Sequence, residues 1–365
     1  MSILDESDSL GLKYTTKRAA MDAMVKQINS NGGLGGSGHP VELTYCVTQF
    51  DPNLAQKCAR DAAADPSILA IVGETTNYPD QVNPVLEGAS MASIGTEPYG
   101  ENDGLSPNSF PTAAGYISTV AGMGTVLADV GGAKKISVIH VDVPSALASV
   151  EIIKTALKAR GLELVHSIAI PIGKADVAAE TAAALDGSDG IALLTDPATA
   201  NKVIESMTQQ GKIVPIGGSG GQFSADALAG LGSAGNGVLL ANWYASDDVK
   251  APGVTEYLRV MEKFSSLKNS DDLAKSGYTA MLLLNDAAKA VPTIDRKSLL
   301  DALRSMKSFD TGGLTPTIDF TSSGPIVLAG KALPRFVNPT VMYGKVVDGA
   351  VHAVDGKFIN PLAPK

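Results

Sequence analysis

Apolar and polar residues alternate along this chain with two periods, and the periods predict strands and helices in regular succession. Residues 41–47 alternate apolar and polar side chains, which is the period of a strand. Leu54, Cys58 and Ala62 recur every four residues, as on one face of a helix. Residues 68–72 then form a short apolar run, typical of a parallel strand buried on both faces. The stretch is therefore predicted to be strand, helix and strand.

The same succession continues to about residue 241. Further helices are predicted at 21–28, 79–88, 113–130, 145–160, 176–185, 198–210 and 224–231. Further strands are predicted to end near Leu4 and to lie at 91–96, 109–111, 136–141, 164–170, 191–194, 213–216 and 238–241. Two consecutive β-α-β series predict an α/β fold of two doubly wound lobes with mostly parallel sheets.

The C-terminal third departs from this rhythm. Helices are predicted at 254–265, 271–290 and 296–306, followed by strands at 317–321 and 336–347 and a turn at Asp348-Gly349. The pattern of these segments does not by itself assign them to either lobe.

Four segments in this order and spacing carry a family resemblance. They are Ile28-Asn29-Ser30-Asn31-Gly32-Gly33, the run Cys46…Asp51-Pro52-Asn53…Cys58-Ala59-Arg60…Ile71-Val72-Gly73, Gly277-Tyr278-Thr279-Ala280, and Leu333-Pro334-Arg335-Phe336-Val337-Asn338-Pro339. On these segments the chain resembles the type I periplasmic solute-binding proteins, and within them the branched-chain amino-acid-binding type that serves ABC importers. The resemblance covers almost the whole chain.

The resemblance implies lobes joined by three crossovers, near residues 112, 245 and 323. The N-terminal lobe would comprise 1–112 plus 246–322 and the C-terminal lobe 113–245 plus 323–365, with the ligand cleft between them. It also implies a monomeric protein, periplasmic or lipid-anchored at the cell surface, that binds a small molecule by hinge closure and delivers it to a membrane ABC permease. Residues 1–8 lead straight into acidic side chains, so we expect a signal segment to be absent from this chain.

Composition narrows the classes of partner. The chain has 365 residues, which is long enough for two domains. Because 44% of the residues are hydrophobic and only 18% are charged, each domain can bury a large core. Its net charge of −9 disfavours nucleic acid and anionic membrane surfaces. No apolar run approaches the roughly 18 residues that span a bilayer. Four scattered histidines form no metal-ligand spacing, and no cofactor motif opens a helix after the first strand, so we expect no cofactor or metal.

The only two cysteines are Cys46 and Cys58, one on a predicted strand and one on the inward face of the helix that follows. A return crossover can bring these positions together, which makes a disulfide geometrically plausible. A bridge would indicate an oxidising compartment. The alternative is a pair of reduced thiols in the core.

Candidate ligand-binding residues lie after strands of the first lobe, because ligands of open parallel sheets bind at the carboxyl ends of strands. These residues are Thr75, Thr76 and Asn77 in one loop and Thr96 and Glu97 in the next. In the resembled family the matching loops bind the ligand's carboxylate; the alternative is ordinary helix capping. Ser9, in the acidic loop after the first strand, is a further candidate, whereas most carboxylates of that loop are expected to be solvated.

The corresponding candidates of the second lobe are Asp142, Ser145, Asp196 and Ser219, with Trp243 and Tyr244 as possible pocket walls. Asp196 suits an ammonium group but also suits a helix cap. Trp243 and Tyr244 alternatively pack between lobes. The family often has an aromatic residue near Ser145 and an acidic one near Ser219, and this chain has neither. Because the pocket positions of the second lobe are Asp, Ser and Gly, we expect a small polar, carboxylate-bearing ligand rather than one with a leucine-like side chain. An aromatic or amide-bearing acid is the alternative if Trp243 and Tyr244 line the cleft.

Two other functions remain to be weighed. Gly217-Gly218-Ser219-Gly220-Gly221 matches the G-x-S-x-G pattern of α/β-hydrolases, in which Ser219 would need His352 as its base. No helix is expected to begin directly behind Ser219, and His352 lies in a hairpin-like tail, so the hydrolase alternative is weak. A ligand-sensing domain of a regulatory system would use the same fold, and nothing in the sequence favours it.

Overall fold

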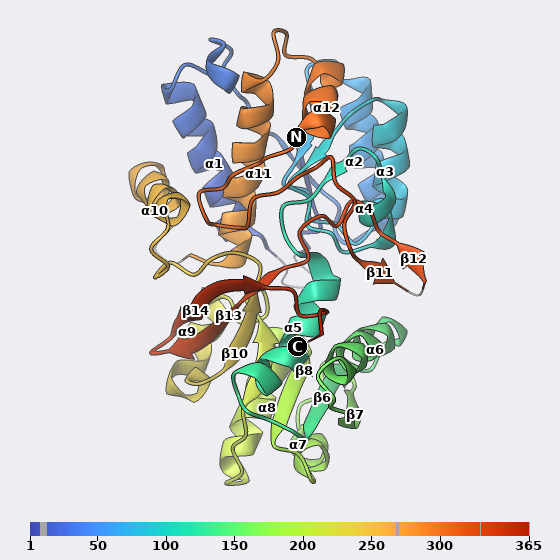
Figure 1. The fold of residues 1–365 in the computed structure, drawn as a ribbon, viewed down its shortest axis with the longest axis vertical. Coiled ribbons are helices and arrows are strands. Elements are labelled where there is room, and N and C mark those ends of the chain that lie inside the picture. Colours follow the sequence, from blue (N-terminus) through green and yellow to red (C-terminus); the bar gives the residue numbers. More distant parts are fainter. Residues whose placement is uncertain (8–12, 268–269, 329, 365) are drawn as a thin grey trace. The chain divides into compact units, whose positions relative to one another are not determined.

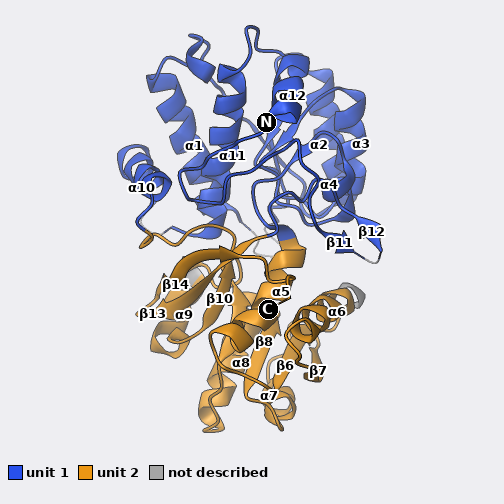
Figure 2. Ribbon diagram, in the orientation of Figure 1, with its two compact units in different colours: residues 1–115, 250–339 blue, residues 116–249, 340–365 orange. Residues whose placement is uncertain are grey.

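The chain folds into two compact units, each with its own sheet. The computed structural model describes residues 1–7, 13–267, 270–328 and 330–364. Unit 1 comprises Met1–Gly115 and Lys250–Pro339, and unit 2 comprises Tyr116–Val249 and Thr340–Lys365 (Figure 2). The chain therefore passes from one unit to the other three times.

The third passage lies later than the sequence predicted. The expected positions were near 112, 245 and 323, and the units divide after residues 115, 249 and 339. Residues 323–339 stay with unit 1 because Arg335 fastens them there. Its guanidinium donates to the backbone oxygens of Ser109 and Phe320 and lies 4.6 Å from the centre of the Phe110 ring. The assignment of 323–339 to the second lobe was wrong.

Unit 1 contains a parallel sheet of very short strands. They are β1 (Ser2–Leu4), β2 (Tyr45–Val47), β3 (Ile71–Val72), β4 (Ser93–Ile94) and β5 (Ser109–Phe110). β1 pairs with β2, and β3, β4 and β5 pair in that order. The Val72 and Thr75 amides donate to the Met1 and Ile3 carbonyls at 2.9 and 3.0 Å, joining the two sets in the order β2-β1-β3-β4-β5. The strand order reverses between β1 and β3, where ligands of such sheets bind.

Seven helices surround this sheet in the described part of unit 1 (Figure 1). They are α1 (Thr15–Ser30), α2 (Pro52–Ala64), α3 (Pro79–Gly88), α4 (Glu101–Leu105), α10 (Pro252–Phe264), α11 (Asp272–Lys289) and α12 (Arg296–Ser305). α1 and α11 lie side by side although α1 ends at Ser30 and α11 begins at Asp272. Gly277 permits this approach, because a Cβ there would stand 2.8 Å from the Lys17 carbonyl oxygen.

Unit 2 is built on a seven-stranded sheet in the order β14-β13-β10-β9-β8-β6-β7. The strands are β6 (Ile136–Val141), β7 (Leu164–Ile170), β8 (Gly190–Leu194), β9 (Ile216–Ser219), β10 (Leu239–Asn242), β13 (Val341–Val347) and β14 (Ala350–Ile359). β6 to β10 are parallel, and β13 and β14 add an antiparallel edge. The helices are α5 (Gly115–Asp129), α6 (Pro144–Lys158), α7 (Ala178–Leu185), α8 (Pro197–Gln209) and α9 (Ala225–Leu231). The predicted α/β class is confirmed.

Three predicted strands were misplaced. The strand expected at 213–216 begins only at Ile216, because Pro215 has no amide to donate and Ile213 is 75% exposed. The segment 317–321 makes a single bridge between Phe309 and Ile318, since the Asp319 carboxylate bonds the Thr321 amide and turns the chain. The predicted strand at 336–347 begins at residue 341. A short hairpin, β11 (Val327–Leu328) and β12 (Lys331–Ala332), precedes it in unit 1.

Cys46 of β2 and Cys58 of α2 form a disulfide, with their Cα atoms 5.8 Å apart. The Asp51 carboxylate accepts the Asn53 amide and begins α2, and Pro52 follows at its first position. This start places Cys58 on the buried face of α2 beside β2, so the disulfide interpretation is confirmed. Within the described residues, every helix falls short of the length and hydrophobicity that a bilayer-crossing segment requires.

We expect reduction of the disulfide to lower the free energy of unfolding by about 3 kcal/mol, because the bridge closes a short loop and restricts the unfolded chain. Denaturant unfolding with and without reductant measures the change. The Cys46→Ala/Cys58→Ala double variant is the control and should not respond to reductant. An unchanged midpoint for the reduced wild type would contradict the expectation.

Candidate functional site

Three loops meet at the strand ends of unit 1. They follow β1, β3 and β4 and contain the predicted residues Thr75, Thr76, Asn77, Thr96 and Glu97. Four of these residues bond one of two buried charged side chains, Asp5 and Lys17, and Thr96 lies beside Glu97 in the chain. Ser9 lies outside the described residues.

Asp5 organises the first group. Its side chain is completely buried, and its carboxylate accepts hydrogen bonds from the Thr48 hydroxyl at 2.5 Å and the Thr76 hydroxyl at 2.9 Å. The Asn77 amide and side-chain nitrogen donate to its other oxygen, at 2.7 and 3.2 Å. The prediction that most carboxylates of this loop are solvated is wrong for Asp5, because these donors replace water. Thr76 and Asn77 therefore shape the loop after β3.

Lys17 of α1 organises the second group. Its ammonium is fully buried and donates to Thr75 Oγ1 at 2.5 Å and to Glu97 Oε1 at 2.7 Å. The Ser276 hydroxyl of α11 donates to the same Glu97 oxygen at 2.5 Å, and the Tyr99 hydroxyl donates to the other at 3.2 Å. Burial lowers the pKa of Lys17, and the adjacent Glu97 charge opposes that shift. The negative charge of Glu97 is thus balanced inside unit 1.

Two further carboxyl groups lie beneath the loops and have raised pKa values. Burial raises the pKa of Glu74 to about 8 and that of Asp103 to about 7. Glu74 accepts the Ser93 hydroxyl on one oxygen at 2.6 Å, and its other oxygen has no partner among the described residues. Asp103 accepts hydrogen bonds from the Asn83 side chain and from the Tyr99 and Gly100 amides, so its carboxyl group is already occupied.

Thr96 differs from its neighbours. It is 2% exposed and directly follows the β4 strand end, yet its hydroxyl and amide make no hydrogen bond to any residue in the described ranges. The loops thus hold two unsatisfied donors next to acidic groups that are already paired or neutral. Such donors suit an anionic oxygen of a ligand.

The strand ends of unit 2 carry the second set of predicted residues. Asp142 follows β6, is exposed, and its carboxylate has no partner among the residues described. Asp196 caps α8 by accepting the Thr199 amide at 2.9 Å, as its capping interpretation predicted. Ser219 ends β9, and Ser145 lies in the first turn of α6, where its side chain is not described.

Gln222 was missed by the sequence analysis. Its side-chain nitrogen donates to the Thr195 carbonyl at 2.8 Å, which ties the loop after β9 to the loop after β8. Its Oε1 is buried without a partner among the described residues. A glutamine directly behind a glycine-rich loop was the available signal.

Trp243 and Tyr244 follow β10 and are 6% and 1% exposed. The Trp243 indole donates to the Thr119 hydroxyl of α5 at 2.5 Å. This bond fixes the ring against unit 2 itself, so Trp243 has a structural role in addition to any contact with a ligand.

The hydrolase alternative fails on geometry. His352 on β14 is in register with Lys345, which faces Leu239, which in turn faces Gly217 on β9. Three strand spacings, about 14 Å, therefore separate His352 from the strand that ends at Ser219. His352 instead contacts Asp248 at 3.2 Å. Among the described residues no group of His, Cys, Asp and Glu side chains is arranged to hold a metal ion.

Known proteins resemble this two-unit α/β architecture over nearly its whole length. The sequence matches the periplasmic binding protein family model over residues 8–327. No match was found among curated proteins. At 17–19% identity, the structural likenesses below show the fold alone.

Three solved structures illustrate the likeness. A leucine binding protein, LivK, from Thermotoga maritima is 18% identical with a TM-score of 0.75, covering 99% of this chain and 98% of that one. The branched-chain amino acid transporter substrate binding protein LivJ from Streptococcus pneumoniae, in complex with isoleucine, is 17% identical with a TM-score of 0.77, covering 98% of both chains. A fatty acid ABC transporter substrate-binding protein from Thermomonospora curvata is 19% identical with a TM-score of 0.74, covering 98% and 91%.

The fold and its polar strand ends define a two-unit solute-binding class, and the family match covers most of the sequence. The chain belongs to the periplasmic binding protein family. The predicted family resemblance is confirmed.

Lys17→Met should lower the free energy of unfolding by about 3–5 kcal/mol, because it leaves the Glu97 carboxylate buried without its counter-charge. Denaturant unfolding measures the loss. Lys297→Met, which removes the same charge from an exposed pair with Asp301, is the control and should cause no measurable loss. Equal midpoints for Lys17→Met and the wild type would show that the pair does not stabilise unit 1.

Glu74 should make the protein less stable as the pH rises. The folded chain keeps this proton to about pH 8, whereas the ordinary pKa of the group is 4.5. Between these values the folded state binds more protons than the unfolded state, so stability falls by about 1.4 kcal/mol per pH unit. Glu74→Gln should remove this contribution, and exposed Glu87→Gln should not. Unfolding free energies at several pH values test this, and parallel curves for Glu74→Gln and wild type would contradict it.

Proposed function

We propose that this chain is the extracytoplasmic solute-binding component of an ABC importer, and that its ligand is a small polar molecule with a carboxylate. The strand-end loops of the two units would close on the ligand by a hinge motion at the three passages of the chain. Closure would shift the population toward the form that a membrane permease recognises. The Cys46–Cys58 disulfide supports an oxidising, extracytoplasmic location, and the protein would act as a monomer.

The observation that carries this proposal is the state of Thr96. Its hydroxyl and amide are unsatisfied within the described residues at the end of β4. The neighbouring Glu97 is already paired with Lys17, and Asp5 already accepts four hydrogen bonds. A carboxylate oxygen therefore suits the donors that Thr96 offers, while the paired Asp5 and Glu97 present no free charge to an ammonium group.

The other end of the ligand would be selected by unit 2. Asp142 has a free, exposed carboxylate among the described residues, which suits an ammonium or amide group. Gln222, with its unsatisfied oxygen, offers a further polar contact behind Ser219. An amino-acid-like solute or a related acid or amide matches both ends.

The ligands of three structural relatives support the ligand class. Leucine, isoleucine and fatty acids are named for three of them, and all three carry a carboxylate. They differ in the rest of the molecule. Their common group, the carboxylate, is one that the donors of Thr96 can bind.

A thermal-shift screen of ligand-stripped protein tests the proposal. Its panel contains amino acids, amides, short and aromatic carboxylic acids, and sugars. A ligand at a hundred times its Kd should stabilise the protein by about 2.7 kcal/mol. We expect a dose-dependent hit that carries a carboxylate and is chemically unchanged after incubation. Hits among uncharged sugars alone, or consumption of the hit, would contradict the proposal.

Thr96→Val should then weaken binding of the carboxylate hit by about 10- to 100-fold, because a hydrogen bond to a charged group is lost. Calorimetric titration measures the affinity. Thr317→Val, at an exposed position, is the control and should bind as the wild type does. An unchanged affinity in Thr96→Val would remove Thr96 from the site.

A further inference from the structure

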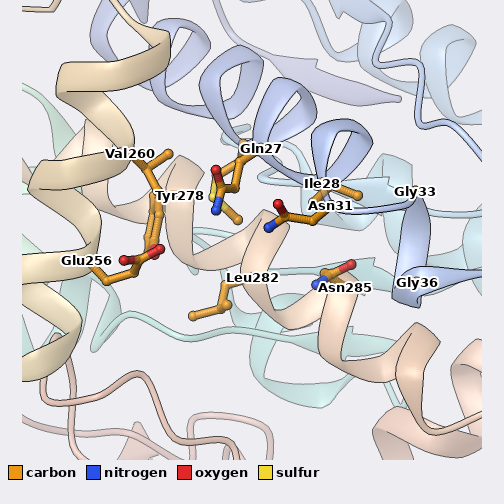
Figure 3. Close-up of a pocket in the computed structure, with 11 residues that line it drawn as sticks. Gln27, Ile28, Asn31, Gly33, Gly36, Glu256, Val260, Tyr278, Leu282 and Asn285 are labelled. Atoms are coloured by element: carbon orange, nitrogen blue, oxygen red, sulfur yellow. The ribbon is translucent and has the colours of Figure 1, made fainter.

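A cavity lies among the helices of unit 1. It has a volume of about 190 Å³, is open to solvent on one side, and is lined by the C-terminal half of α1, the turn after it, α10 and α11 (Figure 3). From Lys17, at the strand-end loops, to Ile28 of the cavity, α1 rises roughly 16 Å. The cavity is therefore distinct from the strand-end loops.

Tyr278 gives this cavity an unsatisfied polar group. The residue is 3% exposed and lines the cavity, and its hydroxyl makes no hydrogen bond to any residue in the described ranges. Its neighbour Tyr257 packs edge-on against it, with ring centres 5.2 Å apart, and accepts a hydrogen bond from the Ser270 hydroxyl at 3.0 Å. The Tyr278 ring is buried, and its accessible hydroxyl can bond a group that enters the cavity.

Three carboxamide side chains converge on the same space (Figure 3). Gln27 of α1 and Asn31, which directly follows α1, make no side-chain hydrogen bond within the described residues. Asn285 of α11 uses only its oxygen, which accepts the Gly35 amide at 2.9 Å, and its NH₂ group stays unused. Carboxamides both donate and accept hydrogen bonds, so this set matches a ligand whose groups do the same.

The cavity presents no unbalanced charge. Glu256 is its only charged lining residue, and both of its oxygens accept hydrogen bonds from Arg259, at 2.6 and 2.7 Å. The remaining lining side chains are apolar, and they are Met24, Ile28, Val260 and Leu282. A ligand here would be uncharged, with hydrogen-bonding groups toward the carboxamides and an apolar face toward the aliphatic side chains.

We propose that this cavity is a second small-molecule site, which binds one uncharged polyhydroxylated molecule the size of a single sugar ring. An engineered cavity of about 150 Å³ accommodates benzene, so the volume found here suits one ring rather than a larger ligand. Hydroxyl groups satisfy both functions of the carboxamides, and the C–H face of the ring contacts Ile28 and Leu282. The site is independent of the carboxylate ligand proposed for the strand ends.

Methyl NMR of the full chain, labelled on its ten methionines, tests the proposal with D-glucose and myo-inositol as probes. Met24 lines the cavity, whereas Met123 and Met207 lie in unit 2 and report on unrelated effects. We expect a saturable shift of the Met24 methyl with a dissociation constant of about 1–10 mM, and no saturable shift of the other two. D-gluconate and D-glucosamine, which are charged, should bind at least several-fold more weakly.

Three variants separate binding from folding. Tyr278→Phe removes only the unpartnered hydroxyl and should weaken binding about 3- to 10-fold while the melting temperature stays the same. Asn31→Trp, at an exposed position on the cavity wall, should abolish the saturable shift. Tyr257→Phe is the matched control: it removes a hydroxyl that is hydrogen-bonded and outside the cavity, so it should lower the melting temperature and leave the affinity unchanged.

Two results would overturn the proposal. One is the absence of a saturable Met24 shift with both probes, or equal shifts at Met123 and Met207. The other is a saturable Met24 shift that persists in Asn31→Trp with unchanged affinity, which would place the bound probe elsewhere.

Discussion

The ion pair between Lys17 and Glu97 is the interaction on which the architecture of unit 1 depends. It joins α1 to the loop after β4, and through Thr75 and Ser276 it also joins the loop after β3 and α11. Taking both charges out of water costs free energy. Hydrogen bonds from the Ser276 and Tyr99 hydroxyls to the Glu97 carboxylate help to offset that cost. Lys17, Glu97, Thr75 and Ser276 come from four different segments of the chain. The loops at the strand ends therefore cannot move independently of α1 and α11.

This constraint supports the ligand class proposed for the strand ends. A site whose acidic groups are paired internally presents its unsatisfied donors rather than its charges, and Thr96 is the residue left with such donors. Loops held in place before the ligand arrives lose little conformational entropy on binding. The proposed preference for a carboxylate therefore follows from how the charges of unit 1 are arranged and does not require a positive charge exposed to solvent.

α1 and α11, which supply the Lys17 and Ser276 partners of Glu97, also line the cavity described above. Lys17 and Ser276 lie near the N-terminal ends of α1 and α11, whereas Asn31 and Asn285 lie toward their C-terminal ends. The close packing that Gly277 permits keeps the helices parallel neighbours between these points. One rigid helix pair thus supports a polar loop cluster at one end and a cavity lined by carboxamides at the other.

The sequence by itself predicted the α/β class, the family and most of the local elements, because period and turn chemistry act over a few residues. It made a Cys46–Cys58 disulfide plausible, since these residues lie only 12 positions apart, and the tertiary structure decided between the bridge and two reduced thiols. It also located Thr75, Thr76, Asn77, Thr96 and Glu97, because polar loops after buried strands are visible in the pattern. Only the tertiary structure decided that Asp5 is buried, that residues 323–339 remain with unit 1, and that Lys17 meets Glu97. Two of the partners of Glu97, Lys17 and Ser276, are 80 and 179 residues away, and no local period encodes contacts at such separations. These contacts arise when helices from both ends of unit 1 pack on one sheet.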